Sequence, residues 1–135
     1  MLGMYIVLEN YLQMVCDYPE AYEGQPGFEF IQQIPTTWDE TKVVTAELNE
    51  YICIARRNGK NWYIGAINSS KQKEINIPMN FLPAGNYKAT MFTDSPATVN
   101  DPNILLKHEK IISNKDSLTI SLAAGGGAAM IISSE

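Results

Sequence analysis

Eight short segments rich in β-branched and aromatic residues fill the chain from Lys42 onward, with turn residues between them. Closely spaced runs of this kind are typical of an antiparallel sandwich or barrel. The chain has 135 residues, enough for one buried core. The sequence therefore predicts a mainly β fold, an antiparallel Greek-key β-sandwich of about eight strands. The predicted strands are 43–48, 51–57, 61–68, 74–78, 85–93, 108–113, 117–123 and 128–133.

Local signals refine this prediction at three places. Asn58-Gly59 predicts a hairpin with a type I′ turn, because both central residues of that turn need a positive φ. Residues 51–55 are apolar on both faces, so this strand is expected to be covered from both sides. Residues 94–107, with two prolines, form the one long predicted connection, which is either a binding loop or a Greek-key crossover.

Residues 1–41 differ from the rest of the chain in charge. They hold 7 acids and no base, whereas the remainder holds 8 acids and all 10 bases, so the two parts carry −7 and +2 of the total of −5. An apolar pattern over residues 2–16 predicts a helix that is apolar nearly all round, and such a helix must be enclosed. Two interpretations stay open: packing on one face of the following sheet, or membership of a larger domain. Asp17-Tyr18-Pro19 ends this helix, and a short second helix is predicted at 26–34.

Several classes of partner are not expected. The largest basic cluster is the pair Arg56-Arg57 in an acidic chain, which argues against a nucleic-acid partner. Cys16 and Cys53 lack zinc spacing and are expected to be small buried apolar residues. The first apolar run falls short of the ~20 residues that span a bilayer, and no positive charge precedes it as in a signal peptide. No membrane partner is therefore expected.

No residue is nominated as catalytic, cofactor-binding or metal-binding. Glycoside hydrolysis commonly needs two carboxyl groups across a pocket, but the acids of the strand region fall at strand edges, where acids are usually solvated. His108 has no Ser or Cys in a motif beside it. Gly125-Gly126-Gly127 precedes a strand and predicts a turn or bulge, not a phosphate loop. The acids considered are Glu50, Glu74, Glu109 and Asp116.

Aromatic residues leave a carbohydrate-binding interpretation open. A sugar-stacking platform is one use for such side chains, and core packing is the other, favoured for Trp62 because it opens a strand after a tight hairpin. Asn68-Ser69-Ser70 also fits the N-glycosylation acceptor pattern, which carries little weight without a secretory signal. The aromatic candidates are Trp38, Trp62, Tyr63 and Tyr87.

A series of motifs runs through nearly the whole chain and carries a resemblance to a known family. The motifs are Leu12–Tyr22, Gly27–Ile31, Pro35–Thr41, Glu50–Ile52, Ala55–Arg57, Trp62–Ala66, Phe81–Pro83, Gly85–Ala89 and Leu122–Gly127. Together they closely resemble the C-terminal end of family-97 glycoside hydrolases, which are bacterial α-glucosidases and α-galactosidases. In that family a β-supersandwich and a (β/α)8 catalytic barrel precede a C-terminal β-sandwich described as an oligomerisation domain.

The resemblance implies a division of the chain. Residues 1–35 would be the last helix of the barrel and a linker, and residues 36–135 the C-terminal sandwich. It implies a noncatalytic domain that braces the barrel and joins subunits. The family's catalytic carboxylates and calcium ligands would lie upstream of Met1, so this chain would hold no cofactor and be inactive alone.

The resemblance also bears on partners and location. The implied partner is the rest of a parent glycosidase or a second copy of this chain. A carbohydrate-binding module with weak sugar affinity and a stand-alone homodimerising sandwich remain the alternatives. The parent enzyme is expected in the periplasm, although this chain shows no export signal. The choices between α-glucoside and α-galactoside, and between inversion and retention, stay open.

Overall fold

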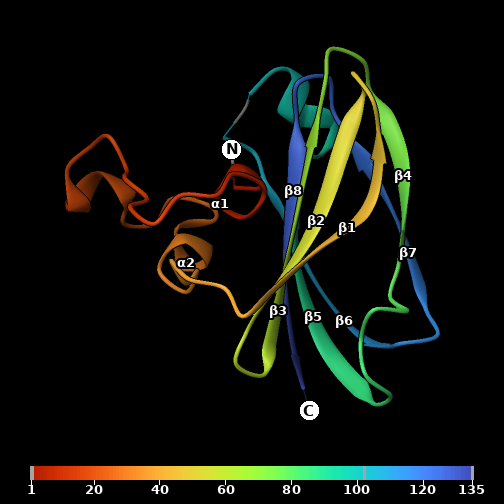
Figure 1. Cartoon of the computed structure of the whole chain (residues 1–135). Coiled ribbons are helices and arrows are strands. Elements are labelled where there is room, and N and C mark those ends of the chain that lie inside the picture. The colour runs from red at the N-terminus through yellow and green to blue at the C-terminus, as the bar shows by residue number, and fades with distance from the viewer. Residues whose placement is uncertain (1, 102, 135) are drawn as a thin grey trace.

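Eight antiparallel strands form two sheets of unequal size in this computed structural model, which describes residues 2–101 and 103–134. One sheet has six strands in the order β1-β2-β3-β8-β5-β6, and the other pairs β4 with β7 (Figure 1). The strands are β1 (Glu40–Glu47), β2 (Tyr51–Asn58), β3 (Asn61–Asn68), β4 (Lys73–Pro78), β5 (Asn86–Thr93), β6 (Leu106–Ser113), β7 (Ser117–Leu122) and β8 (Gly127–Ser134). Because β8 returns to pair with β5, the last four strands follow a Greek key. The predicted mainly β sandwich is confirmed.

The long connection between β5 and β6 does not cross between sheets. The two strands pair directly over eight residues, so residues 94–105 close a wide hairpin and the crossover interpretation is wrong. Within it the 3-10 helix η2 (Pro96–Val99) begins with a capping box, in which the Ser95 hydroxyl accepts hydrogen bonds from the backbone of Ala97 and Thr98. These local hydrogen bonds stabilise the first turn of η2.

The predicted hairpin between β2 and β3 is present, but its turn lies one residue further along. Asn58 pairs with Asn61, so the two central residues are Gly59 and Lys60. Gly59 has φ 58°, and Asn49 is the one non-glycine residue with positive φ among the described residues. A single positive φ at the first central position is the pattern of a type II′ turn. The predicted type I′ turn centred on Asn58-Gly59 is therefore wrong.

The main core lies between the two sheets. It takes alternate residues of the large sheet, among them Cys53, Ala55, Trp62 and Ile64, and closes them against the inner face of the β4–β7 pair. β7 shows the predicted alternation of exposed and buried positions. The other alternate residues of the large sheet face away from this core and need a cover of their own.

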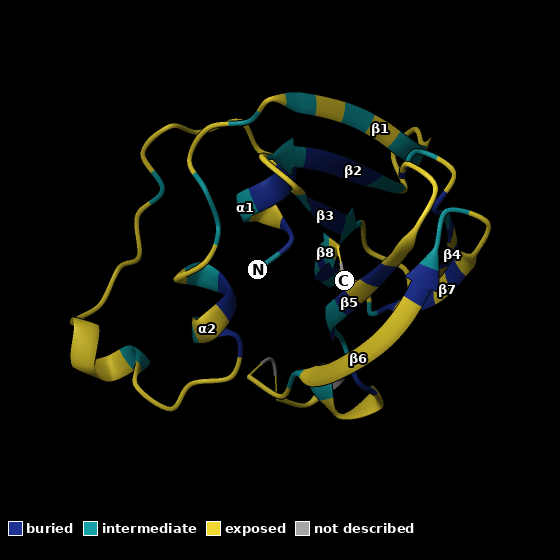
Figure 2. Ribbon diagram, turned by 90° about the horizontal axis from the view of Figure 1, so that it is seen from below, coloured by how far each residue is buried: buried dark blue, intermediate teal, exposed yellow. Residues whose placement is uncertain are grey.

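That cover is the N-terminal layer, defined here as residues 2–7 and 27–38. It contains α1 (Met4–Val7) and α2 (Phe28–Ile31) and lies on the outer face of the large sheet (Figures 1 and 2). Ile6 and Phe30 are fully buried in it, packed with Tyr63 and other outward-facing residues of the sheet. The prediction that β2 is covered on both faces is confirmed.

The predicted helix at 2–16 is far shorter in the structure. Only Met4–Val7 is helical, and the second predicted helix shrinks to Phe28–Ile31. Beyond Val7, polar side chains compete for the backbone: Asn10 Oδ1 accepts from Leu12 N at 3.0 Å, and Gln13 Nε2 donates to Tyr5 O at 2.8 Å. Most helix stability comes from burying a face, and the described residues do not bury residues 8–16. Packing on the sheet, the first of the two interpretations, holds for α1.

Candidate functional site

Half of the exposed large apolar side chains of the described residues lie on one segment that stands away from the sheet. We call residues 8–23 the exposed arm; it includes the 3-10 helix η1 (Pro19–Tyr22) and forms the outlying loop in Figure 2. Its large apolar side chains are up to 77% exposed, and contiguous exposed apolar groups mark interaction sites. The side chains are Leu8, Tyr11, Leu12, Met14, Val15 and Tyr18.

The exposed arm is acidic as well as apolar. Its four acids are Glu9, Asp17, Glu20 and Glu23, and none of them forms an ion pair within the described part of the chain. The other three acids of residues 1–41 do form ion pairs, for example Glu29 with Lys107 at 2.8 Å. The charge imbalance seen in the sequence is therefore concentrated on one exposed surface.

The exposed arm is nevertheless held in place at its end. The Tyr22 hydroxyl accepts hydrogen bonds from the backbone N–H groups of Cys16 and Asp17, each at 3.0 Å. The Tyr22 ring stacks on Phe28 with ring centroids 5.6 Å apart. These contacts join the arm to α2. Cys16 lies exposed on the arm, so the expectation that it is buried is wrong.

The two adjacent arginines of β2 lie in opposite surroundings. Arg57 is paired with Asp39 at 3.3 Å and with Glu40 at 3.2 Å. Arg56 points under the N-terminal layer, is only 5% exposed, and has no carboxylate within 4.0 Å among residues 2–101 and 103–134. Its Nη2 donates a 3.4 Å hydrogen bond to the carbonyl of Val7, and its guanidinium lies 5.7 Å from the centre of the Trp38 ring.

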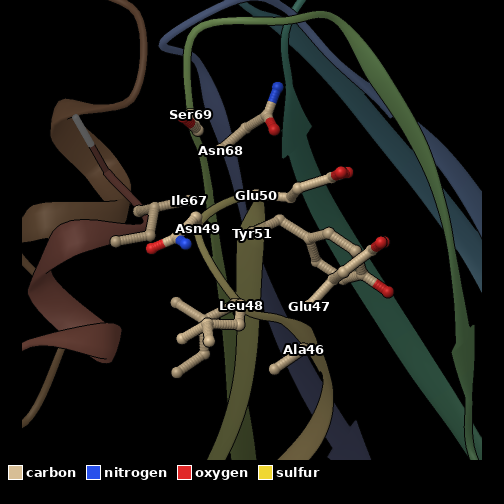
Figure 3. Close-up of a pocket in the computed structure, with 10 residues that line it drawn as sticks. Ala46, Glu47, Leu48, Asn49, Glu50, Tyr51, Ile67, Asn68 and Ser69 are labelled. Atoms are coloured by element: carbon tan, nitrogen blue, oxygen red, sulfur yellow. The ribbon is translucent and has the colours of Figure 1, made fainter.

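An open depression of about 610 Å³ lies at the turn between β1 and β2. Figure 3 shows its lining from Ala46 to Tyr51 and from Ile67 to Ser69. Glu50, considered above as a candidate acid, is part of this lining. It binds the Lys73 ammonium group together with Glu47, and the hydrogen bond from Lys73 lowers the pKa of Glu50. A general acid needs a raised pKa, so Glu50 is not arranged for that role.

The remaining acids considered from the sequence lie on separate elements. Glu74 is on β4 and exposed. Glu109 on β6 pairs with Lys88 at 2.9 Å, and that hydrogen bond lowers its pKa. Asp116, in the β6–β7 turn, has a lowered pKa because the backbone N–H of Ser113 donates to it at 2.6 Å. Within the described residues, no group of three or more His, Cys, Asp or Glu side chains is arranged to hold a metal ion.

The aromatic candidates do not form an exposed platform. Trp62 is 3% exposed and packs edge-to-face on Phe81, with ring centroids 5.0 Å apart. Tyr63 and Tyr87 are also buried. Trp38 is partly buried and packs against Tyr63 at 5.4 Å. All four serve packing, so the carbohydrate-binding alternative gains no support from them.

The other motifs singled out in the sequence have structural roles. Asn68 Nδ2 donates to the carbonyls of Lys71 at 2.6 Å and Ala123 at 2.9 Å, so this amide is engaged within the fold. Gly125-Gly126-Gly127 forms the turn into β8, as predicted. Cys53 is buried, and burial raises the pKa of its thiol to about 12. No helix among the described residues has the length and apolar character to cross a membrane.

Comparison with known proteins decides the family. Residues 37–133 match the family described as "Glycosyl-hydrolase 97 C-terminal, oligomerisation". The chain belongs to this family. It is 38% identical over 97% of its length to a retaining α-galactosidase of Bacteroides thetaiotaomicron. It is 26% identical over 96% of its length to a probable retaining α-galactosidase of Streptomyces bingchenggensis.

A solved relative shows the same domain in a larger protein. A glycoside hydrolase family 97 enzyme from Pseudoalteromonas sp. strain K8, in complex with acarbose, superposes with a TM-score of 0.92 at 30% identity and covers 99% of this chain. The chain spans 22% of that enzyme and 20% of each of the two curated relatives. The resemblance inferred from the sequence motifs is thus confirmed.

Sequence reasoning missed the two most informative features of this surface, the exposed arm and the isolated Arg56. The pattern of residues 2–16 indicated an apolar helix, not an exposed coil. For Arg56 the sequence did contain a signal. Ile52, Ile54 and Arg56 share one face of the strand because they are alternate residues, and that face was predicted to be covered, so Arg56 could have been predicted to lie under the cover.

Proposed function

We propose that this chain is the noncatalytic C-terminal domain of a longer family-97 glycoside hydrolase, where it braces the catalytic domain and joins subunits. The observation that carries the proposal is the exposed arm, an apolar and acidic surface directly beside the N-terminal layer. Exposing apolar side chains of this kind to water is unfavourable in free energy. Covering them with another domain removes that unfavourable hydration.

The relatives suggest the chemistry of the parent enzyme. Both curated relatives bear the name of retaining α-galactosidases, so we assign the parent to that reaction. Residues 1–35 would then belong to the end of its catalytic domain and residues 36–135 to the sandwich. Catalytic carboxylates, and calcium if the parent uses it, would be supplied by the part of the parent that precedes this domain.

Light scattering over a range of protein concentrations tests the association role. We expect the chain to form larger species as its concentration rises, and the double variant Leu12→Ser/Met14→Ser to do so less, because it removes two side chains more than 70% exposed on the arm. Leu48→Ser is the matched control, since Leu48 is 89% exposed but lies on the β1–β2 turn. A monomer at every concentration would contradict the role in joining subunits.

An activity assay tests the noncatalytic role. The isolated chain should not hydrolyse an aryl α-galactoside, with or without added calcium. Turnover that survives repurification and scales with the amount of chain would contradict it.

A further inference from the structure

Arg56 is a buried cation without a counter-ion in the described part of the chain. Its side chain lies between the outer face of β2 and the N-terminal layer, and the residue is only 5% exposed. A buried charge is strongly unfavourable unless it is paired and hydrogen-bonded. The partners that Arg56 does have, one long hydrogen bond to the Val7 carbonyl and the face of Trp38, carry no negative charge.

The hydrogen-bonding capacity of Arg56 is also unfilled. A guanidinium has five N–H donors in a fixed planar fork. Nη2 makes the bond to Val7, whereas Nε is buried and has no partner among the described residues. A buried donor left unsatisfied costs the full desolvation of that group. Among the described residues, Arg56 Nε is the one buried side-chain nitrogen or oxygen without a hydrogen-bond partner. Such a donor indicates an acceptor that comes from outside the described chain.

The position of Arg56 indicates the source of that acceptor. It lies beneath residues that lead directly into the exposed arm, the surface to which the proposed function assigns the catalytic domain. Arg57, its neighbour in sequence, points to the opposite face and already holds two carboxylates. Arg57, which faces the sandwich, is therefore paired within the described chain. Arg56, which faces the N-terminal layer, has no ion pair there.

We propose that Arg56 binds an Asp or Glu carboxylate of the parent enzyme's catalytic domain, so that docking of the two domains completes a buried ion pair. The planar carboxylate matches the guanidinium fork and would accept from Nε and from one terminal nitrogen. This inference rests on the proposed function, because it takes the catalytic domain as the partner that covers the arm.

The two arginines make a direct test in the present chain practical, since Arg56 and Arg57 are its only arginines. A ¹⁵N spectrum should show two Nε–H signals, assigned by the variant Arg57→Lys. Sodium formate serves as the probe, a free carboxylate titrated against sodium chloride at equal ionic strength. We expect a saturable shift of the Arg56 signal and none of the Arg57 signal, whose Nε already donates to Glu40 at 3.2 Å. No formate-specific shift of Arg56 would overturn the proposal.

Thermal unfolding provides the second measurement. Formate should raise the melting temperature of the wild-type chain above its value in chloride, because a ligand that binds the folded state stabilises it. The increment should vanish in Arg56→Met and persist in Arg57→Met. If Arg56→Met does not fold, Arg56→Lys replaces it, since lysine keeps the charge but lacks the fork and should lose most of the increment. An equal increment in all variants would overturn the proposal.

Two further outcomes separate this inference from the function on which it rests. A shift of the Arg56 signal with chain concentration alone would assign the carboxylate to a second copy and would overturn the assignment to the catalytic domain. Light scattering on the same samples reports association independently of formate. Association without a formate response would leave the proposed function standing and remove only the inference about Arg56.

Discussion

The carboxylate of Asp94 occupies the space that a side chain at Gly126 would need. Its Oδ2 accepts hydrogen bonds from the backbone N–H groups of Ala123 and Gly127, each at 2.9 Å. A Cβ atom at Gly126 would collide with the same oxygen. The glycine turn between β7 and β8 is therefore built around an acid that directly follows β5.

This arrangement predicts strong coupling between Asp94 and Gly126. Gly126→Ala should lower the free energy of unfolding by about 1–3 kcal/mol through overpacking. Asp94→Ala should cost a similar amount, about 1–3 kcal/mol, because it leaves two backbone donors without their charged acceptor. The double variant should cost clearly less than the sum, since removing the carboxylate relieves the collision. Denaturant unfolding measures all three, and additive costs would contradict the shared space.

The Tyr87 hydroxyl should contribute measurably to stability. It donates to the carbonyl of Pro83 at 3.0 Å, four residues upstream, from a ring that is 8% exposed. Tyr87→Phe should lower the free energy of unfolding by about 0.5–1.5 kcal/mol. Tyr63→Phe is the matched control, because the Tyr63 hydroxyl reaches the Gln33 carbonyl only at 3.4 Å and should cost less. An equal or larger cost at Tyr63 would contradict this ranking.

Docking of the N-terminal layer depends on the absence of a side chain at Gly65. A Cβ atom there would lie 2.6 Å from the carbonyl oxygen of Gly3 and 2.7 Å from Ile6 Cβ. Gly65→Ala should therefore displace α1 and speed amide hydrogen exchange in residues 3–7, while the β4–β7 pair stays protected. Gly59→Ala is the control: it strains a turn at φ 58° where a Cβ meets no atom within 4 Å, and α1 should stay docked. Unchanged exchange in Gly65→Ala would contradict the packing.

Acid should remove a stabilising interaction from the β6–β7 turn. The backbone and hydroxyl of Ser113 both donate to Asp116 and lower its pKa below the ordinary value of 3.8. A carboxylate with a lowered pKa in the folded state contributes stability that is present above its unfolded pKa and is lost as the pH falls through the folded pKa. Asp116→Asn should therefore flatten the fall of the melting temperature below about pH 4, close to the unfolded value. Parallel profiles for the two proteins would contradict this.

The two thiols should differ in reactivity. Cys16 is exposed on the arm, whereas Cys53 is buried in the core, where burial raises its thiol pKa to about 12. Because the thiolate is the reactive form, iodoacetamide should alkylate one cysteine per folded chain and both after unfolding. Mass spectrometry of peptides identifies the site, and modification of Cys53 in the folded chain would contradict the burial.

The strands could be predicted from sequence because each strand carries its own signal. Alternation along β7 and the turn residues between strands are signals that act over a few residues. For β3 the predicted range, 61–68, is the observed one. The turn at Gly59 shows the limit of prediction from such local signals. Both candidate turns put a positive φ on the same glycine, and only the pairing of Asn58 with Asn61 across the sheet selects between them.

The N-terminal part could not be predicted in the same way, because its structure is set by contacts distant in sequence. Over residues 8–16 the apolar residues outnumber the polar ones, Glu9, Asn10 and Gln13. Periodicity alone does not say which of the apolar residues will be covered. Ile6 is buried because Gly65 leaves room for it, and no local pattern reports that. The isolation of Arg56 likewise depends on a strand register and a layer that meet only in the folded chain.

Both faces of the large sheet are covered, but by different parts of the chain. Along each central strand, odd-numbered and even-numbered residues are therefore under different evolutionary constraints. At odd positions of β2, such as Cys53 and Ala55, a substitution must be accommodated by the small sheet. On the opposite face, a substitution at a position such as Arg56 or Tyr63 must be accommodated by the N-terminal layer and by any domain that docks on it. Compensating changes between relatives should therefore fall into two independent sets that alternate residue by residue along a single strand.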